Sequence, residues 1–559
     1  MSGGGGQATG EEGQVPAGEG QVPTGLCNLS DVCVLGCLAF LPSESVLACV
    51  GVCKTVGRAA GAEELWRERC FSDWGSVGPQ LPDRRTSADS HLAAWVAWKR
   101  AFRGYDASMV RRVCLWWTGV EEWVSRHIPE MAESLTPGAT ESALDAASAS
   151  LGWELPAELR VLYHFHDGQW LPWDTHLDAA LGEEPGRPGP GSLSAAARRK
   201  SLALGLFGGY GFYDHMATCK MWSLARGVTA AQLLADPMRE ACNRAGYAES
   251  TERWGVQLDA IQGRGGFLLA ANHDLSKRVW VGVDGCVRMD GKDRPLFGVM
   301  DAAPAREGEG NLIPWLEEYL GRLRGGWYKV RQLWEDDPVE AGAPASEPSS
   351  GSESYLPRGI CLFPAATEAG RLEAVTRGVQ VQVSAVFVPE WCRSRAEPWW
   401  AYSVRMRLLR DHPSCQQGMQ SCQLTKRHWE IDGGEGFHRE VDGAAVIGLH
   451  PLLRLPGTKA RDQIRGQEGV GAGDQSEGVG TAQGTGEDDD NDQGEGCGDS
   501  DDDGLGPFFE YQSCTSVRMP PGSMGGYFTF QPGSMDTPQG AEFPATVPTF
   551  PLVVPSFIY

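Results

Sequence analysis

The sequence predicts a multidomain protein whose secondary structure changes along the chain from all-α, through α+β, to all-β. Its 559 residues exceed a single domain, because one domain usually takes about 100–200 residues. Near the N-terminus apolar residues recur at helical spacing, as at Val32, Leu35 and Leu38. In the last third of the chain apolar and polar residues alternate, with Val379 and Val381 on either side of a glutamine. Such alternation is typical of half-buried strands.

Composition divides the chain into successive segments. We expect a disordered tail at 1–25, a short helical domain at 26–74, a helical connector at 75–115, an α+β domain at 116–334, a linker at 335–357 and a β domain at 358–559. The linker is rich in Pro, Ser and acidic residues. Within the β domain, 458–507 reads as a disordered acidic insertion, and such a loop adds only about 2 kcal/mol of closure entropy to a sandwich.

The net charge of −24 is concentrated in that insertion. The stretch from Gly466 to Gly506 has 13 acidic residues and no Lys or Arg, which leaves −11 over the other 518 residues. This balance gives no reason to expect nucleic-acid binding. The longest apolar run, from Val32 to Pro42, is about half of the ~20 residues that a spanning helix needs, so we expect no membrane partner. The 16 scattered cysteines favour reduced thiols in the cytoplasm or nucleus.

The helices of 26–74 bury too little surface to be stable alone, which is typical of a module that docks on a partner. Three segments, Leu29-Ser30-Asp31, Val52-Cys53-Lys54 and Leu65-Trp66-Arg67, resemble the F-box pattern. The F-box implies docking on the Skp adaptor of cullin-based ubiquitin ligases. Carried over by position, the adaptor-binding residues are Leu29, Leu35, Leu38, Val52, Cys53, Leu65 and Trp66.

Three positions in this block depart from the F-box pattern. Ser30 replaces a Pro, Val32 a Glu, and Val56 an aromatic residue. A small helical bundle of another kind therefore stays open as the alternative.

In the middle block, a helix that breaks at Gly152 is followed by a second helix with Pro156 in its first turn. The segments 267–270 and 278–283 are expected to form a hairpin. The sequence around these positions resembles the SUKH (Smi/Knr) superfamily. The resemblance rests on the motif from Leu151 to Leu159 and on the Asp167-Gly168 turn. This resemblance implies an α+β binding scaffold without common catalytic residues.

The β block resembles the ApaG domain, which implies a fibronectin type III-like sandwich used for protein recognition. Five short sequence motifs, in the same order as in ApaG domains, carry the resemblance over some 150 residues. The motif residues are Arg377, Gly378, Arg427, His428, Trp429, Gly443, Gly448, Tyr511, Ser523, Met524 and Gly526. Some ApaG proteins have a G-x-G-x-x-G loop suspected of binding phosphate, but here Ala445 replaces the middle glycine. Its Cβ would obstruct a phosphate, so phosphate binding is the less favoured interpretation.

Three patterns invite a metal site, and we interpret each as structural. Cys33, Cys37, Cys49 and Cys53 form C-x3-C pairs, which inside helices are expected to fill the core. His164 and His166 lie two apart on a helix, so they should point in different directions. The run Asp499 to Glu510 spells an EF-hand loop but lacks flanking helices. We therefore expect no metal and no cofactor.

The order of the three domains resembles plant and animal F-box proteins of the same composition. The leading hypothesis is a substrate-recognition subunit of a Skp–cullin–F-box ubiquitin ligase, which binds the Skp adaptor, and through it cullin and a RING protein, and presents an unidentified protein substrate. No P-loop, zinc-protease, C-x-x-C or G-x-S-x-G motif is found, so we expect a non-catalytic subunit. The alternatives are an F-box-like scaffold outside any ligase and a phosphate- or nucleotide-sensing ApaG protein.

Overall fold

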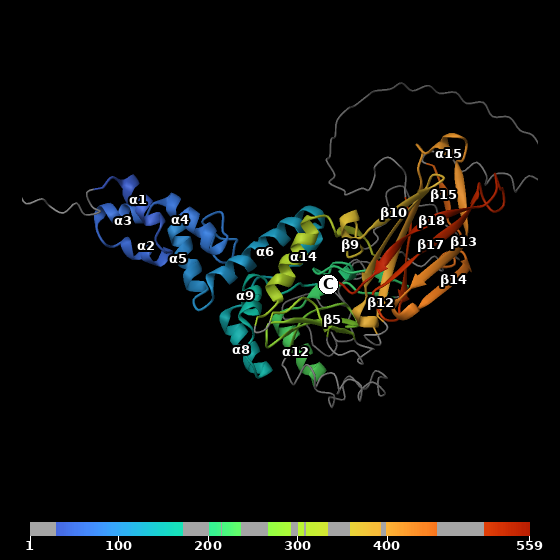
Figure 1. Cartoon of the computed structure of the whole chain (residues 1–559). Helices are drawn as coiled ribbons and strands as arrows, with labels where there is room; N and C mark the ends of the chain where they lie inside the picture. Colours follow the sequence, from blue (N-terminus) through green and yellow to red (C-terminus); the bar gives the residue numbers. More distant parts are fainter. Residues whose placement is uncertain are drawn as a thin grey trace, which may run out of the picture. The chain divides into compact units, whose positions relative to one another are not determined.

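The computed structural model describes residues 29–171, 201–213, 215–235, 266–291, 300–306, 309–333, 358–392, 398–455 and 508–559. The predicted tail, linker and acidic insertion, including the EF-hand-like run up to residue 507, lie outside these ranges. The chain forms two compact units, Met1–Arg111 and Arg112–Tyr559. Their contents confirm the predicted fold class, because helices alone are followed by a mixed α+β region and then by a β-sandwich (Figure 1).

The first unit is built from short helices around a core of tryptophans. Its elements are α1 (Asp31–Ala39), α2 (Ser43–Cys49), α3 (Lys54–Ala60), α4 (Glu63–Arg69), the π-helical turn η2 (Cys70–Trp74) and α5 (His91–Ala101). Trp66 of α4 packs on Trp95 of α5 with ring centroids 5.1 Å apart, and Trp74 stacks on Trp98 at 6.0 Å. Helix α5 therefore packs into the same core as α4 and η2, within the compact unit that ends at Arg111.

The α+β region combines helices with a small antiparallel sheet. Its helices are α6 (Ala107–His127), α7 (Pro129–Glu133), α8 (Glu141–Leu151), α9 (Ala157–Phe165), α12 (Leu224–Ala235) and α14 (Leu312–Arg324). Its main sheet has the order β3 (Lys220–Met221), β4 (Gly266–Ala271), β5 (Lys277–Gly282), β6 (Val287–Gly291) and β7 (Met300–Asp301). A two-stranded ribbon joins β1 (Gly211–Phe212) to β2 (His215–Met216). Trp222, Leu268 and Trp280 form a buried cluster with residues of α12, which packs against β4.

The local predictions for this region are confirmed. Gly152 ends α8 with φ of 78°, a left-handed conformation that glycine adopts without strain. Pro156 is the N-cap of α9. The strands β4 and β5 form the expected hairpin.

The C-terminal region is a sandwich of two antiparallel sheets. One sheet has the order β10 (Leu372–Thr376), β11 (Val379–Phe387), β12 (Trp399–Leu408) and β16 (Phe509–Ser516). The other has the order β14 (His438–Ala444), β13 (Ser421–Asp432), β17 (Gly522–Pro532) and β18 (Phe543–Leu552), with β15 (Leu452–Arg454) also paired to β13. Val379, Val381 and Val383 of β11 are buried between the sheets. The period-two patterns thus form strands as predicted, and β18 lies at the edge of its sheet.

The segment that follows residue 357 begins by pairing with the α+β region. Strand β8 (Lys329–Gln332) pairs with β9 (Arg358–Cys361), and Gly209 donates to the carbonyl of Ile360 at 2.9 Å. The first strand after the predicted linker is therefore part of the α+β region. The chain's last residues also return to it, because the Tyr559 hydroxyl donates to the carbonyl of Trp315 on α14 at 2.9 Å. Figure 1 shows the C-terminus beside α14 and β5.

Candidate protein-docking sites

The first unit exposes several large apolar side chains on α1 and in the connections that follow α1 and α2. We call this set the N-terminal apolar surface: Val32, Phe40, Leu41, Val50 and Val52. Phe40 is 91% exposed, Val32 79% and Val52 67%. Scattered apolar residues are common on protein surfaces, whereas a concentration on one short module is typical of a protein–protein contact.

The residues predicted to bind the adaptor fall into two groups. Leu29 and Val52 are exposed, and Leu35 and Cys53 are half-buried. Leu38, Leu65 and Trp66 are buried; they form the core beneath the surface.

Sequence reasoning missed Phe40, Leu41 and Val50 as candidate contacts. The available signal was the long apolar run from residue 32 to 42. Helix α1 buries only Val34 and Leu38, so the run contains more apolar side chains than this helix can bury.

The expectation that the four N-terminal cysteines fill the core is wrong for two of them. Cys33 and Cys37 are exposed, while Cys49 and Cys53 are half-buried. The reason is helical phase: α1 turns Val34 and Leu38 inward. Cys33 and Cys37, one position earlier, are rotated by about 100° from that face.

Several ApaG motif residues have conformations that shape the sandwich. Arg377 and Gly378 form the two-residue turn between β10 and β11, with φ of 50° and 91°. Positive φ at both turn positions matches the twist of a hairpin. Gly526 has φ of 142°, and a Cβ there would lie 2.1 Å from the carbonyl oxygen of His428. These residues are explained by backbone geometry.

Other motif residues belong to the core of the sandwich. Trp429, Tyr511 and Met524 are buried, and the Trp429 ring meets Phe528 edge-on at 5.4 Å. Ser523, half-buried on β17, faces Asp432 of β13 in the strand register. The motif therefore identifies the fold more than a ligand site.

The loop that corresponds to the glycine-rich motif is occupied by an arginine. Arg427 donates to the carbonyls of Ala444 at 3.0 Å and Ala445 at 2.6 Å, and its guanidinium carbon lies 2.8 Å from the position that a Cβ on Gly443 would take. Ala445 has φ of 68°, and Gly448 at the end of the loop has φ of 80°. The Ala445 N–H donates to a neighbouring carbonyl of β13. Because carbonyls face the arginine and this N–H is already bonded, the loop does not favour phosphate.

The outer face of β13 and β14 has two histidine–carboxylate pairs in register. His428 Nδ1 lies 2.8 Å from Asp442 Oδ1, and His438 Nδ1 lies 2.8 Å from Asp432 Oδ1. The hydrogen bonds to these carboxylates raise the pKa of both histidines above the ordinary value of 6.5. Both histidines of this face therefore stay protonated to a higher pH than an unpaired histidine would.

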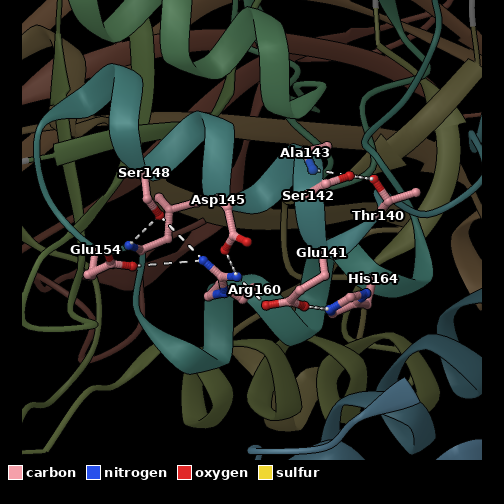
Figure 2. A network of polar contacts seen from close by, with 10 residues as sticks. Thr140, Glu141, Ser142, Ala143, Asp145, Ser148, Glu154, Arg160 and His164 are labelled. Carbon is pink, nitrogen blue, oxygen red and sulfur yellow. Dashed lines mark hydrogen bonds and ion pairs between the residues drawn. The ribbon is translucent and has the colours of Figure 1, made fainter. Parts of the chain in front are cut away.

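The two histidines at the end of α9 contact different groups, as the sequence predicts. His164 Nε2 lies 2.6 Å from Glu141 Oε2, whereas His166 Nε2 lies 2.5 Å from Glu121 Oε1. Figure 2 shows Glu141 between His164 and Arg160. Arg160 is the central cation of this network, which joins α8 to α9.

A buried polar cluster lies where the α+β region meets the sandwich. Glu390, in the short 3-10 helix η8 (Pro389–Trp391), accepts from Tyr210 at 2.8 Å and bonds His215 at 2.9 Å. Lys277 donates to the Tyr210 hydroxyl at 3.2 Å and to the Tyr559 carbonyl at 2.5 Å. Burial alone would raise the pKa of Glu390, but the Lys277 charge and the His215 bond outweigh it and lower that pKa.

Across the described ranges, no cluster of three or more His, Cys, Asp or Glu side chains is arranged to hold a metal ion. Among the helices that the structure describes, none is both long and apolar enough to span a bilayer.

Part of the sandwich matches a known family of domains. Residues 392–459 match the family described as the ApaG domain (DUF525). The protein ApaG of Anaeromyxobacter dehalogenans is 29% identical over 185 residues, which is 33% of this chain and 94% of that protein. The chain is thus a multidomain protein with a C-terminal ApaG-type sandwich.

Longer relatives extend the similarity to the other domains. The F-box protein SKIP16 of Arabidopsis thaliana is 27% identical over 528 residues, which covers 92% of this chain and 94% of that protein. The human F-box only protein 3 is 20% identical over 423 residues, 74% of this chain and 70% of that protein. The predicted resemblance to F-box proteins and to the ApaG domain is confirmed, while the SUKH-like assignment of the middle region stays a prediction.

Proposed function

We propose that this chain is the substrate-recognition subunit of a Skp–cullin–F-box E3 ubiquitin ligase. In this role the first unit binds the Skp adaptor, which connects it to cullin and a RING protein, and the second unit holds a protein target. The chain itself contributes no catalytic group to ubiquitin transfer. The cytoplasm or the nucleus is the compartment that suits this role.

The observation that carries the proposal is the N-terminal apolar surface on a chain similar to F-box proteins over 92% of its length. An adaptor that covered Val32, Phe40 and Val52 would remove mostly exposed apolar side chains from water. Each fully buried side chain of this size contributes about 1.5–3 kcal/mol. In this proposal Leu38, Leu65 and Trp66 do not contact the adaptor directly. They pack in the core and stabilise the helices whose exposed residues bind the adaptor.

The test is co-purification of the full-length protein with the Skp adaptor of its own organism. We expect a stoichiometric complex, and a Phe40→Asp, Val52→Asp double variant should weaken it by about 100-fold, since two buried apolar contacts become charged. A Val77→Asp variant is the matched control, because Val77 is 74% exposed but follows η2 and does not belong to the N-terminal apolar surface. Circular dichroism checks that each variant folds.

The outcomes separate this proposal from its main alternative. Loss of the complex in the double variant alone supports the ligase subunit. A folded wild-type protein that forms no complex contradicts it and favours a scaffold outside any ligase.

A further inference from the structure

A cavity of about 210 Å³ lies between the α+β region and the sandwich. Its lining includes Trp327 and Tyr328, which follow α14, and Trp400 and Phe550 of the sandwich. Pro551 and Pro555 also line it. The volume is below the ~300–1,000 Å³ typical of small-molecule sites and suits a single large side chain.

Arg322 contributes a guanidinium to the lining of this cavity. Its Nε donates to Glu318 at 2.8 Å and its Nη1 to the Tyr328 hydroxyl at 2.8 Å. Its central carbon lies 5.2 Å from the Trp327 ring centroid and 5.1 Å from that of Tyr559. These contacts hold the planar group in one orientation.

Two features of Arg322 decide what kind of ligand suits the cavity. Its charge is already paired with Glu318, so a second carboxylate is not needed. Within the part of the chain that the structure describes, Nη2 has no hydrogen-bond partner. An arginine has five N–H donors, so this nitrogen can donate to a neutral acceptor such as a peptide carbonyl.

We propose that the cavity receives one bulky apolar side chain of an extended segment in a bound protein, whose backbone carbonyl accepts from Arg322 Nη2. Aromatic and arginine residues around a small pocket are the usual setting of a dominant contact in protein recognition. The inference deepens the proposed function, because it names the chemistry by which the second unit holds a target.

The probes are three N-acetyl amino-acid amides, added to the full-length protein and followed by saturation-transfer NMR. N-acetylphenylalaninamide and N-acetylleucinamide should bind with a Kd on the order of 1 mM, as small ligands with few contacts do. N-acetylglycinamide, which has the carbonyl but no side chain, should bind at least tenfold more weakly. Free N-acetylphenylalanine should bind no better than the amide.

Substitutions locate the binding. Ala385 lines the cavity from β11, so Ala385→Phe should fill the cavity and weaken binding of N-acetylphenylalaninamide by at least tenfold. Val375→Phe adds the same ring at an exposed site of β10 away from the cavity and should leave the Kd within twofold. If the Ala385→Phe variant does not fold, Arg322→Lys replaces it as the test. This substitution keeps the charge but removes the planar donor, so it should weaken binding of the phenylalaninamide about fivefold.

Unchanged binding in the folded cavity variants, or no binding of either bulky amide, overturns the inference. Tighter binding of the free carboxylate by tenfold or more also overturns it, in favour of a small acidic ligand. None of these variants touches the first unit, so a failed NMR result beside an intact adaptor complex rejects the pocket alone. A lost adaptor complex with intact amide binding rejects the ligase role alone.

Discussion

Arg69 on α4 donates from Nη2 to the carbonyl oxygen of Leu41 at 2.7 Å. The same nitrogen donates to the carbonyl of Leu38 at 2.9 Å, and Nη1 donates to the Ser43 hydroxyl at 2.8 Å. One buried cation therefore binds the end of α1, the connection and the start of α2. Phe40 lies within this connection, so its exposure depends on a residue in another helix.

Replacing Arg69 with Met should lower the free energy of unfolding of the first unit by about 2–4 kcal/mol, because buried carbonyls lose charge-assisted bonds. It should also weaken adaptor binding, since the segment with Phe40 is no longer fixed. Urea denaturation and co-purification measure the two effects. Arg67→Met, an exposed change on the same helix, should stay within about 0.5 kcal/mol. Equal stability of the two variants would contradict the role of Arg69.

The network in Figure 2 gives a second prediction. Arg160, with a side chain 10% exposed, contacts Glu141, lies 2.5 Å from Asp145 Oδ1 and 3.9 Å from Glu154 Oε2. Arg160→Met should destabilise the protein by about 1–2 kcal/mol, a modest value because the carboxylates are largely solvated. Thermal denaturation measures this change.

The control for that network is Arg306→Met. Arg306 is 87% exposed and lies 3.9 Å from Glu309. We expect a change within about 0.5 kcal/mol. A comparable loss in both variants would mean that the Arg160 network adds nothing beyond ordinary surface charge.

The ionisation of Glu390 should make the free energy of unfolding depend on pH. Its folded pKa lies below the ordinary 4.5, so its contribution is complete above that value and is lost as the pH falls through the folded pKa. Glu390→Gln should therefore destabilise the protein by about 2–4 kcal/mol at pH 7, and the difference from wild type should shrink below pH 4.5. Urea titrations at several pH values measure it. With Glu368→Gln, at an exposed position, no such pH-dependent difference is expected.

The parts of the fold that follow from local pattern could be predicted from sequence. Strands β11 and β12 show a clear period of two, and Gly152 breaks a helix by its own conformational freedom. The pairing of β8 with β9 could not be predicted, because the partners are separated in sequence and neither strand alone indicates its neighbour.

The candidate site shows the same limit. The F-box-like motifs fall in the helical first unit, where Leu38 and Trp66 are buried while Phe40 is exposed. On a helix of nine residues a shift of one position changes which side chains face water. The orientation of Phe40 depends further on Arg69, a contact between distant positions. Predicting which apolar residues are exposed to a partner therefore requires the tertiary structure.

The last prediction concerns the pairing of His428 with Asp442. Because the pKa of His428 is raised above 6.5, the pair stabilises the folded state fully below that value, and the contribution is lost as the pH rises through the folded pKa. NMR titration of the His428 ring should show a midpoint above 6.5, and Asp442→Asn should lower it. The ring of His438 serves as an internal control, because its Nδ1 bonds Asp432 instead. An unchanged His428 midpoint in the variant would contradict the pairing, and an equal shift of both histidines would indicate a general charge effect across the sheet rather than this hydrogen bond.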